Sequence, residues 1–403
     1  MRRAVVFVLL IALALVGGLI LVKSSARQEL KQSEEERAPK SLDALLPQTT
    51  ELDSIEVAPA DPSLELGVSD ASSEWADQNR NGILLLNTGL MEEAVAAFEK
   101  CHAGNPQEPV FGGNLAEALA RLARSIYESG EEPIEIPIGY MERAVKLAPE
   151  RADLVRLLER WKKTAKTEED FWTDETLHFL LSYDGNRSDV LKHGYLEIET
   201  MLETAYDELG LALNHYPVGA GDPKVRVVFY KRAEFAEITG IGHWAGGAFD
   251  GVIRIPLGEF AKQRSELKRI LRHELVHFFV RSLGGKQVPA WLNEGLAQWF
   301  EETSLTIRSA RVEGTNQSLK GLEFFPLAKL RGTLATMKDE NDISRAYAQS
   351  LAFVDYLARI YGDLVLYEMV KGCKTDTPCA ETFHARMGVL FEPTLGDLHE
   401  SLK

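Results

Sequence analysis

The stretch 267–283 combines a helical pattern of apolar residues with the motif His273-Glu274-Leu275-Val276-His277. Residues four apart on a helix lie on one face, so this spacing directs both imidazoles at one point and places Glu274 beside them. The apolar positions of the stretch can pack the same helix into a core. The motif therefore predicts a buried helix that offers two nitrogen ligands to a metal ion and needs a third ligand from elsewhere.

A third ligand is available in the segment 289–301, which reads Pro-Ala-Trp-Leu-Asn-Glu-Gly-Leu-Ala-Gln-Trp-Phe-Glu. Within it, Glu294 follows His277 by 17 residues. The paired glycines 284–285 end the first helix and Pro289 helps to start the next, so the chain can turn back there. We therefore expect Glu294 to join the two histidines in one metal site.

These two motifs together resemble the gluzincin metallopeptidases, the thermolysin-like and aminopeptidase-N-like group, and most closely the domains called peptidase MA-like. The matching residues are the His-Glu-x-x-His of 273–277 and the Trp-Leu-Asn-Glu-Gly-x-Ala of 291–297. The resemblance extends over roughly 170–403, with little detailed match in the flanking sequence. Either motif alone is a moderate signal, and the pair is a strong one.

The resemblance implies one Zn²⁺ per chain, held by His273, His277 and Glu294. Two neutral imidazoles and one carboxylate leave zinc an open position for water, whose pKa then falls towards 7. Glu274, next to the metal but not bound to it, would act as the general base in hydrolysis of a peptide or protein substrate.

Tyr347 is the candidate donor to the oxyanion, because aminopeptidase-like relatives have a tyrosine in a similar place, downstream of the third ligand and before a helix. Gln349-Ser350 follow it where those relatives have Lys-Gly, so the alternative is that Tyr347 packs a helix. Gln298 and Glu301, one and two turns after Glu294, are candidate partners that orient the ligands. The alternative is that Gln298 and Glu301 lie on an exposed helix face, where the same spacing occurs.

The Gly-rich segment 242–249 occupies the place where gluzincins keep an edge strand that pairs with an extended substrate. His243 in this segment is either a substrate contact or a plain loop residue. The segment lacks the Gly-x-Met-Glu-Asn usual in aminopeptidases, and no acidic anchor for a free substrate amine is identifiable. An endopeptidase is therefore favoured over an aminopeptidase.

Strand patterns occur at 177–183, 225–230 and 251–256, with a helical pattern at 195–209 between the first two. Helical patterns follow the metal motif. Strands followed by helices are typical of an α+β domain. We expect this domain at 169–403, and the resemblance implies a small mixed sheet, an active-site helix and C-terminal helices.

The stretch 71–168 has a helical period and predicts an all-α domain. It resembles a tetratricopeptide repeat in the spacing of Gly82, Leu85, Gly89, Met91, Ala94, Phe98 and Pro106. In such a repeat, small residues let two antiparallel helices approach and large ones fill the gap between them. The pattern favours a platform that binds a protein partner, and a plain helical bundle without a ligand is the alternative.

The N-terminus predicts membrane targeting. Met1-Arg2-Arg3 precedes an uncharged apolar run of 19 residues at 4–22, near the ~20 that a helix needs to cross a bilayer. We expect 1–25 to be a retained single-pass anchor with the bulk of the protein on the extracytoplasmic side, and a cleaved signal of a secreted protein is the alternative. A flexible linker rich in Glu, Gln, Ser and Pro follows at 26–70.

Charge and cysteine content limit the remaining functions. The chain has 45 basic and 61 acidic side chains, a formal net charge of −16, which excludes a nucleic-acid partner because phosphate contacts need clustered cations. Its three cysteines are too few for a disulfide framework and form no Cys-x-x-Cys pair. Cys373 and Cys379 either form one local bridge or remain thiols.

The sequence thus predicts a membrane-anchored zinc metallopeptidase. The alternative is a catalytically silent metal-binding or scaffold protein of the cell envelope that acts through its helical repeats. Glu274 argues against this alternative, because a structural metal site has no need of an acid beside an open position.

Overall fold

The computed structural model describes residues 66–67, 74–185, 189–219, 222–239, 246–257, 264–334, 337, 339–374, 381, 384–385, 388 and 390–403. The predicted anchor 1–25 and all but two residues of the predicted linker 26–70 lie outside this set. Within the set, no helix has both the length and the apolar run that crossing a membrane requires. The anchor therefore stays a prediction.

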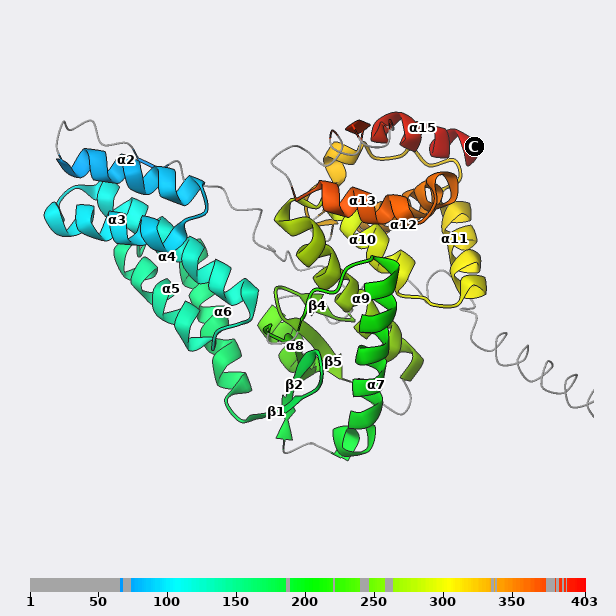
Figure 1. The fold of residues 1–403 in the computed structure, drawn as a ribbon, viewed down its shortest axis with the longest axis horizontal. Coiled ribbons are helices and arrows are strands. Elements are labelled where there is room, and N and C mark those ends of the chain that lie inside the picture. Colours follow the sequence, from blue (N-terminus) through cyan, green and yellow to red (C-terminus); the bar gives the residue numbers. More distant parts are fainter. Residues whose placement is uncertain are drawn as a thin grey trace, which may run out of the picture. The chain divides into compact units, whose positions relative to one another are not determined.

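Among the described residues, a region of five helices comes first and is called the helical region below (Figure 1). Its members are α2 (Glu74–Asn87), α3 (Met91–Gly104), α4 (Pro109–Ser129), α5 (Glu135–Leu147) and α6 (Ala152–Glu168). Each helix packs on the next, around a core that includes the fully buried Phe98, Met141 and Leu154. The helices coincide with the helical pattern of the sequence, and their assignment to the tetratricopeptide repeats stays a prediction.

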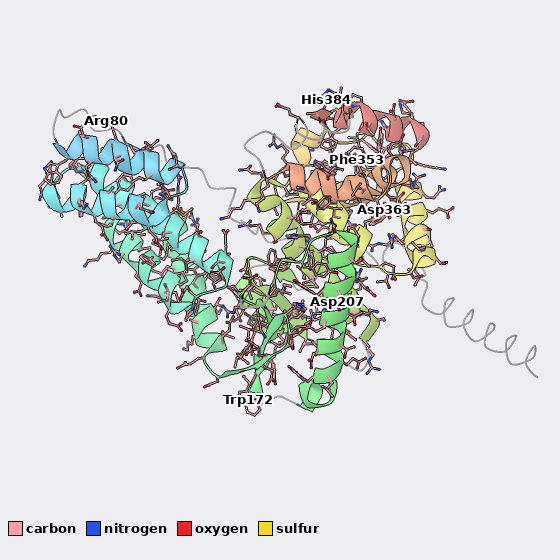
Figure 2. The ribbon with its side chains drawn as sticks, in the orientation of Figure 1. Arg80, Trp172, Asp207, Phe353, Asp363 and His384 are labelled. Atoms are coloured by element: carbon pink, nitrogen blue, oxygen red, sulfur yellow. The ribbon has the colours of Figure 1, made fainter. Side chains whose placement is uncertain are left out.

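A five-stranded mixed sheet follows, with the strand order β1-β2-β3-β5-β4. Its strands are β1 (Phe171–Glu175), β2 (Phe179–Asp184), β3 (Val225–Lys231), β4 (Ala248–Phe249) and β5 (Ile253–Leu257). The central strands β2, β3 and β5 run parallel, with Leu181 opposite Val227 and Val227 opposite Ile253, while β1 and β4 are antiparallel edges. The central strands overlap the three strand patterns of the sequence. Edge strand β1 was not predicted; it is polar and leaves Trp172 exposed (Figure 2).

Different helices cover the two faces of the sheet. Leu181, Val227 and Ile253 belong to the main core, together with apolar side chains of α7 (Asp189–Ala212) and α9 (Arg264–Gly284). On the other face, Val228 and Tyr230 pack against the short helix α8 (Arg232–Thr239). Helix α7 makes the crossover that parallel strands β2 and β3 require. Apolar side chains on both faces of the central strands thus place the sheet between helices.

The rest of the described chain is helical, and it completes an α+β fold of the class expected from the sequence. The elements are η4 (Gly285–Gln287), α10 (Ala290–Phe300), α11 (Leu305–Leu319), η5 (Leu327–Leu330), α12 (Glu340–Tyr361), α13 (Leu364–Gly372) and α15 (Phe391–Ser401). Helix α10 packs on both α9 and α12. Phe353 of α12 (Figure 2) is fully buried, with its ring centroid 5.2 Å from that of Trp291 on α10.

The cysteines lie in separate environments. Cys101 of α3 is a free, buried thiol, whereas Cys373 at the end of α13 is disulfide-bonded. Cys379, the partner considered in the sequence, lies outside the described residues.

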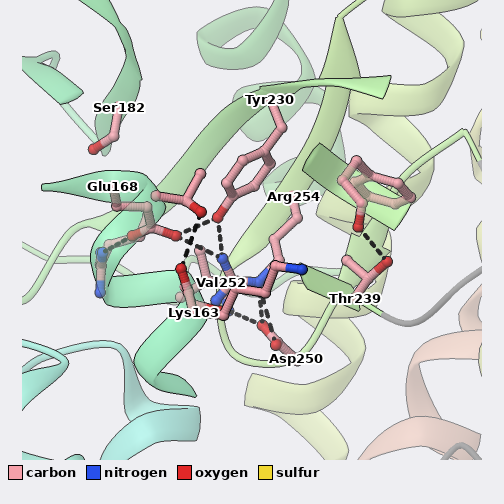
Figure 3. Close-up of polar contacts among 12 residues, drawn as sticks. Lys163, Glu168, Ser182, Tyr230, Thr239, Asp250, Val252 and Arg254 are labelled. Atoms are coloured by element: carbon pink, nitrogen blue, oxygen red, sulfur yellow. Dashed lines mark hydrogen bonds and ion pairs between the residues drawn. The ribbon is translucent and has the colours of Figure 1, made fainter. Parts of the chain in front are cut away.

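Arg254 of β5 joins the helical region to the sheet through a cluster of buried polar contacts, the Arg254 cluster (Figure 3). Its guanidinium donates to Glu168 at the end of α6 (3.0 Å), to Tyr127 of α4 (2.7 Å) and to Tyr230. It also pairs with Asp250 (3.3 Å), which accepts a further hydrogen bond from Tyr127 (3.1 Å). A buried charge is tolerated only with such partners, so the cluster fixes α4 and α6 against β5.

Candidate metal centre

Helix α9 carries the two histidines of the sequence motif. Leu271, Leu275 and Phe279 on the same helix are fully buried in the main core, and their burial fixes the rotation of the helix about its axis. His273 and His277 are then neighbours on one face, with ring centroids 4.9 Å apart and the planes nearly perpendicular at 86°. The helical spacing thus brings the two imidazoles together.

Glu294 meets the histidines because the chain reverses direction after α9. The turn passes through η4, in which Gly285 has a φ of 71°, and Pro289 stands at the start of α10. Oε2 of Glu294 lies 3.8 Å from Nε2 of His273 and 3.8 Å from Nε2 of His277. One ligand atom from each of these three side chains lies within 4.8 Å of the others. The structure therefore gathers the three residues that were predicted as ligands.

The Nε2 atoms are directed at Glu294 because the other nitrogen of each ring is already engaged. Nδ1 of His273 lies 2.6 Å from Oε2 of Glu301, and Nδ1 of His277 lies 3.0 Å from Oδ1 of Asn293. Donation from Nδ1 to these oxygens leaves a lone pair on each Nε2. Two imidazole nitrogens and one carboxylate oxygen are the donor set of catalytic zinc sites, so the residues fit a zinc ion.

Glu301, at the end of α10, is a buried carboxylate with three partners. Its Oε1 pairs with Arg269 (3.1 Å) and with Arg311, while its Oε2 faces His273. Burial by itself opposes ionisation, but the two arginines and the histidine outweigh it and hold the pKa of Glu301 well below its usual range. Glu301 is therefore an ionised acceptor that fixes the ring of His273.

Glu274 stands beside the three ligand residues and is only 6% exposed. Burial raises the pKa of Glu274, and the neighbouring histidines offset part of this effect. The backbone that leads into β4 lies against its carboxylate, because a Cβ added at Gly247 would lie 2.7 Å from Oε1 of Glu274. Only a glycine permits this approach, so β4 borders the candidate metal centre.

Tyr347 reaches the same centre from α12. Burial, and then the charges of Glu294 and Glu274, raise the pKa of Tyr347 well above its usual range, so its phenol is a donor at neutral pH. Gln298, the second candidate partner from the sequence, donates to the backbone carbonyls of Glu294 (3.2 Å) and Tyr347 (3.1 Å). It thereby ties α10 to α12.

Three residues around the centre were missed in the sequence: Asn293, Arg269 and Arg311. Asn293 directly precedes Glu294, and its place inside the second motif was a usable signal. Arg269 lies one helical turn before the first histidine, whereas Arg311 comes from α11 and carries no local signal. His243, the candidate substrate contact, lies outside the described residues.

Residues 235–396 match the family model described as the Peptidase MA superfamily. The match includes β4, α9, α10 and α12, and so both sequence motifs. The comparison with curated proteins gave no match. The family match supports a peptidase MA-like domain, a type that points to a metallopeptidase acting on peptides or proteins.

Proposed function

We propose that the chain is a zinc-dependent metallopeptidase that hydrolyses peptide bonds with Glu274 as the general base. One observation supports this most directly. The ligand atoms of His273, His277 and Glu294 converge within 4.8 Å, beside a buried carboxylate that is not one of the three. Structural zinc sites have four protein ligands, whereas catalytic sites have three and keep a position for water.

His273, His277 and Glu294 would hold the ion. When bound, zinc supplies Lewis acidity, which lowers the pKa of water towards about 7 and polarises the substrate carbonyl. Glu301 and Asn293 hold the two rings so that both Nε2 lone pairs stay directed at one point.

Glu274 moves the proton. Its carboxylate accepts a proton as the water oxygen bonds to the carbonyl carbon, and it returns that proton to the leaving nitrogen as the C–N bond breaks. Burial brings the pKa of Glu274 closer to neutral pH, which suits a group that must both accept and donate. Gly247 keeps β4 beside this carboxylate, where an extended peptide backbone can pair with the strand.

Tyr347 donates its phenolic O–H to the oxyanion that forms on the carbonyl oxygen. The charges of Glu294 and Glu274 both raise the pKa of its phenol, and this supports the role. A donor that keeps its proton at neutral pH stabilises developing negative charge without reorganisation. We also favour internal cleavage of the substrate, since the sequence offers no anchor for a free amine.

The proposed location is the extracytoplasmic side of a membrane. Arg2-Arg3 and the apolar run 4–22 support an N-terminal anchor, and the linker 26–70 would hold the catalytic part away from the bilayer. A C-terminal epitope tag tests this topology: protease added to intact cells or spheroplasts should remove it. A tag that is cut only after lysis contradicts the proposed orientation.

The decisive test of the activity is Glu274→Gln in the full chain. We expect one zinc per chain in both proteins and cleavage of an unstructured peptide by the wild type alone. The matched control is Glu266→Gln, an exposed carboxylate at the start of the same helix, which should cleave normally. Equal cleavage by Glu274→Gln excludes the general-base role. Zinc binding without cleavage by any variant favours the alternative, a scaffold that acts through the helical region.

A further inference from the structure

A cavity of about 410 Å³ lies between the helical region and the candidate metal centre. His277 and Asn293 line it from the metal side, and Phe249 of β4 lines it from the sheet. Leu157 and Arg160 of α6 line the facing wall. The volume lies within the range of about 300–1,000 Å³ that is typical of ligand sites. A substrate bound at the metal centre therefore has a space beside it that the helical region helps to enclose.

Close contacts fix the wall that the helical region contributes. Arg281 and Lys286, which follow His277 along the chain, both pair with Glu128 of α4, at 2.7 and 2.6 Å. Gly251, in the turn between β4 and β5, has a φ of 103°, and a Cβ there would lie 2.0 Å from the carbonyl oxygen of Glu128. No other residue fits at this turn. Together with the Arg254 cluster, these contacts hold α4 and α6 against the metal-bearing domain.

The cavity is cationic, although the whole chain has a net charge of −16. Four basic and two acidic side chains line it: Arg124, Arg160, Arg281, Lys286, Glu128 and Asp250. Both acids are already engaged, Glu128 by Arg281 and Lys286, and Asp250 by the Arg254 cluster. The positive charge that remains attracts an anionic group.

Arg160 is the cation best placed to receive such a group. Its side chain is half-buried in the cavity wall, and no carboxylate of the described residues lies within ion-pair distance of it. Arg124, in the same wall, is already paired with Asp153 (4.0 Å). Trp161 and Tyr127 line the same cavity and stack at 4.5 Å between ring centroids, so the cavity also has apolar surface. Reduced solvent around a guanidinium strengthens its pairing with a carboxylate.

From this geometry we infer that the cavity is a substrate subsite for an acidic side chain, with Arg160 as its specificity-determining residue. The inference rests on the proposed function, because the occupant is a peptide that also reaches the metal centre. The substrate class is therefore a polypeptide with aspartate or glutamate close to the cleaved bond. The helical region would select the substrate as well as hold the catalytic domain.

Binding to the metal-free full chain tests the subsite without catalysis. Three labelled pools of unstructured decapeptides, alike except for glutamate, glutamine or lysine at the varied positions, are titrated by fluorescence anisotropy. We expect the glutamate pool to bind the wild type about tenfold more tightly than the glutamine pool. Arg160→Gln should abolish this preference and Arg160→Glu should shift it to the lysine pool. Arg156→Gln, an exposed arginine of α6 outside the cavity, is the control and should retain the preference.

Cleavage of the same pools by the zinc-loaded wild type separates the two proposals. Faster cleavage of the glutamate pool, lost in Arg160→Gln, supports both of them. Cleavage without charge preference overturns the subsite and leaves the metallopeptidase intact. Charge-selective binding without any cleavage overturns the metallopeptidase and retains the cavity as a site for acidic peptides. Equal binding of all pools by the wild type, or a preference that survives in Arg160→Gln, overturns the subsite.

Discussion

His273 and Glu301 form the closer of the two contacts that fix the imidazole rings of the candidate metal centre, with 2.6 Å between Nδ1 and Oε2. The contact joins the helix that carries the motif to the last residue of the second motif segment. It also places an ionised carboxylate behind a ligand nitrogen, which makes the ring a stronger donor. The arginines that stabilise Glu301 thus act on the centre without touching it.

Glu301→Gln should lower zinc affinity by about 10- to 100-fold, because the neutral amide supports the ring of His273 less well. Competition with a chromogenic chelator measures the affinity. Glu302→Gln, the adjacent residue without a histidine contact, is the control and should bind zinc as the wild type does. Equal affinity in both variants would show that Glu301 serves packing alone.

Zinc should stabilise the fold through Glu294. At a free zinc concentration 100 times the Kd, the free energy of unfolding of the wild type should rise by about 2.7 kcal/mol. EDTA should remove this gain together with the activity, and added zinc should restore both. Glu294→Gln should show a much smaller rise in Tm at the same zinc concentration. A zinc-induced rise of the wild-type size in that variant contradicts the ligand assignment.

Tyr347→Phe should lower kcat by about 10²- to 10³-fold, with KM and zinc content unchanged, because it removes one donor to the oxyanion. Steady-state kinetics on a cleaved peptide, with metal analysis, measure this. Tyr356→Phe on the same helix is the control and should keep its kcat. If Tyr347→Phe also keeps its kcat, Tyr347 is a packing residue, the alternative that the sequence left open.

Gly247→Ala should lower kcat by about 10²-fold, because the new methyl group meets the carboxylate of Glu274 and displaces it. The Tm of the variant should change little, since the clash is relieved by moving one side chain. Gly314→Ala, in α11 with no atom within 4 Å of an added Cβ, is the matched control and should remain fully active. Normal activity of Gly247→Ala is the result that contradicts the contact.

The Arg254 cluster predicts a pH dependence of stability. Burial, and then the charge of Asp250, raise the pKa of Tyr127 above its ordinary value of 10.0. Because the pKa is raised in the folded state, the neutral Tyr127 stabilises the fold fully below pH 10. As the pH rises further, the unfolded chain ionises this tyrosine first and the stabilisation is lost. At pH 8, Tyr127→Phe should be less stable by about 1 kcal/mol, because its hydrogen bonds are lost. Urea unfolding should show that the difference in free energy of unfolding between the wild type and Tyr127→Phe narrows above pH 10. A difference that stays constant contradicts the shifted pKa.

The sequence was sufficient to predict the parts of the candidate site that depend on spacing along a helix or across a short turn. The positions of His273 and His277 follow from one helical period, and that of Glu294 from a turn marked by glycines and a proline. Three strand patterns likewise predicted the central strands. These strands are short runs of apolar and aromatic residues, a pattern that is read locally.

The remaining parts depend on contacts between distant segments, which one sequence does not reveal. Arg311 reaches Glu301 only because α11 packs beside the end of α10, and β4 is too short to show a strand period. The wall of the cavity depends on the hydrogen bonds of Arg254 to Tyr127 and Glu168. These two residues lie 127 and 86 positions away from Arg254 along the chain. Such pairings are set by tertiary packing rather than by local propensity.

The meeting of Gly251 with the end of α4 has a practical consequence for where the chain can be cut. A fragment that begins at residue 169 keeps both sequence motifs but uncovers this turn and the guanidinium of Arg254, and it opens the cavity on one side. Truncation at that point should therefore yield a poorly soluble enzyme with broadened selectivity. A soluble fragment should therefore retain α4 and α6, together with the helices that pack on them.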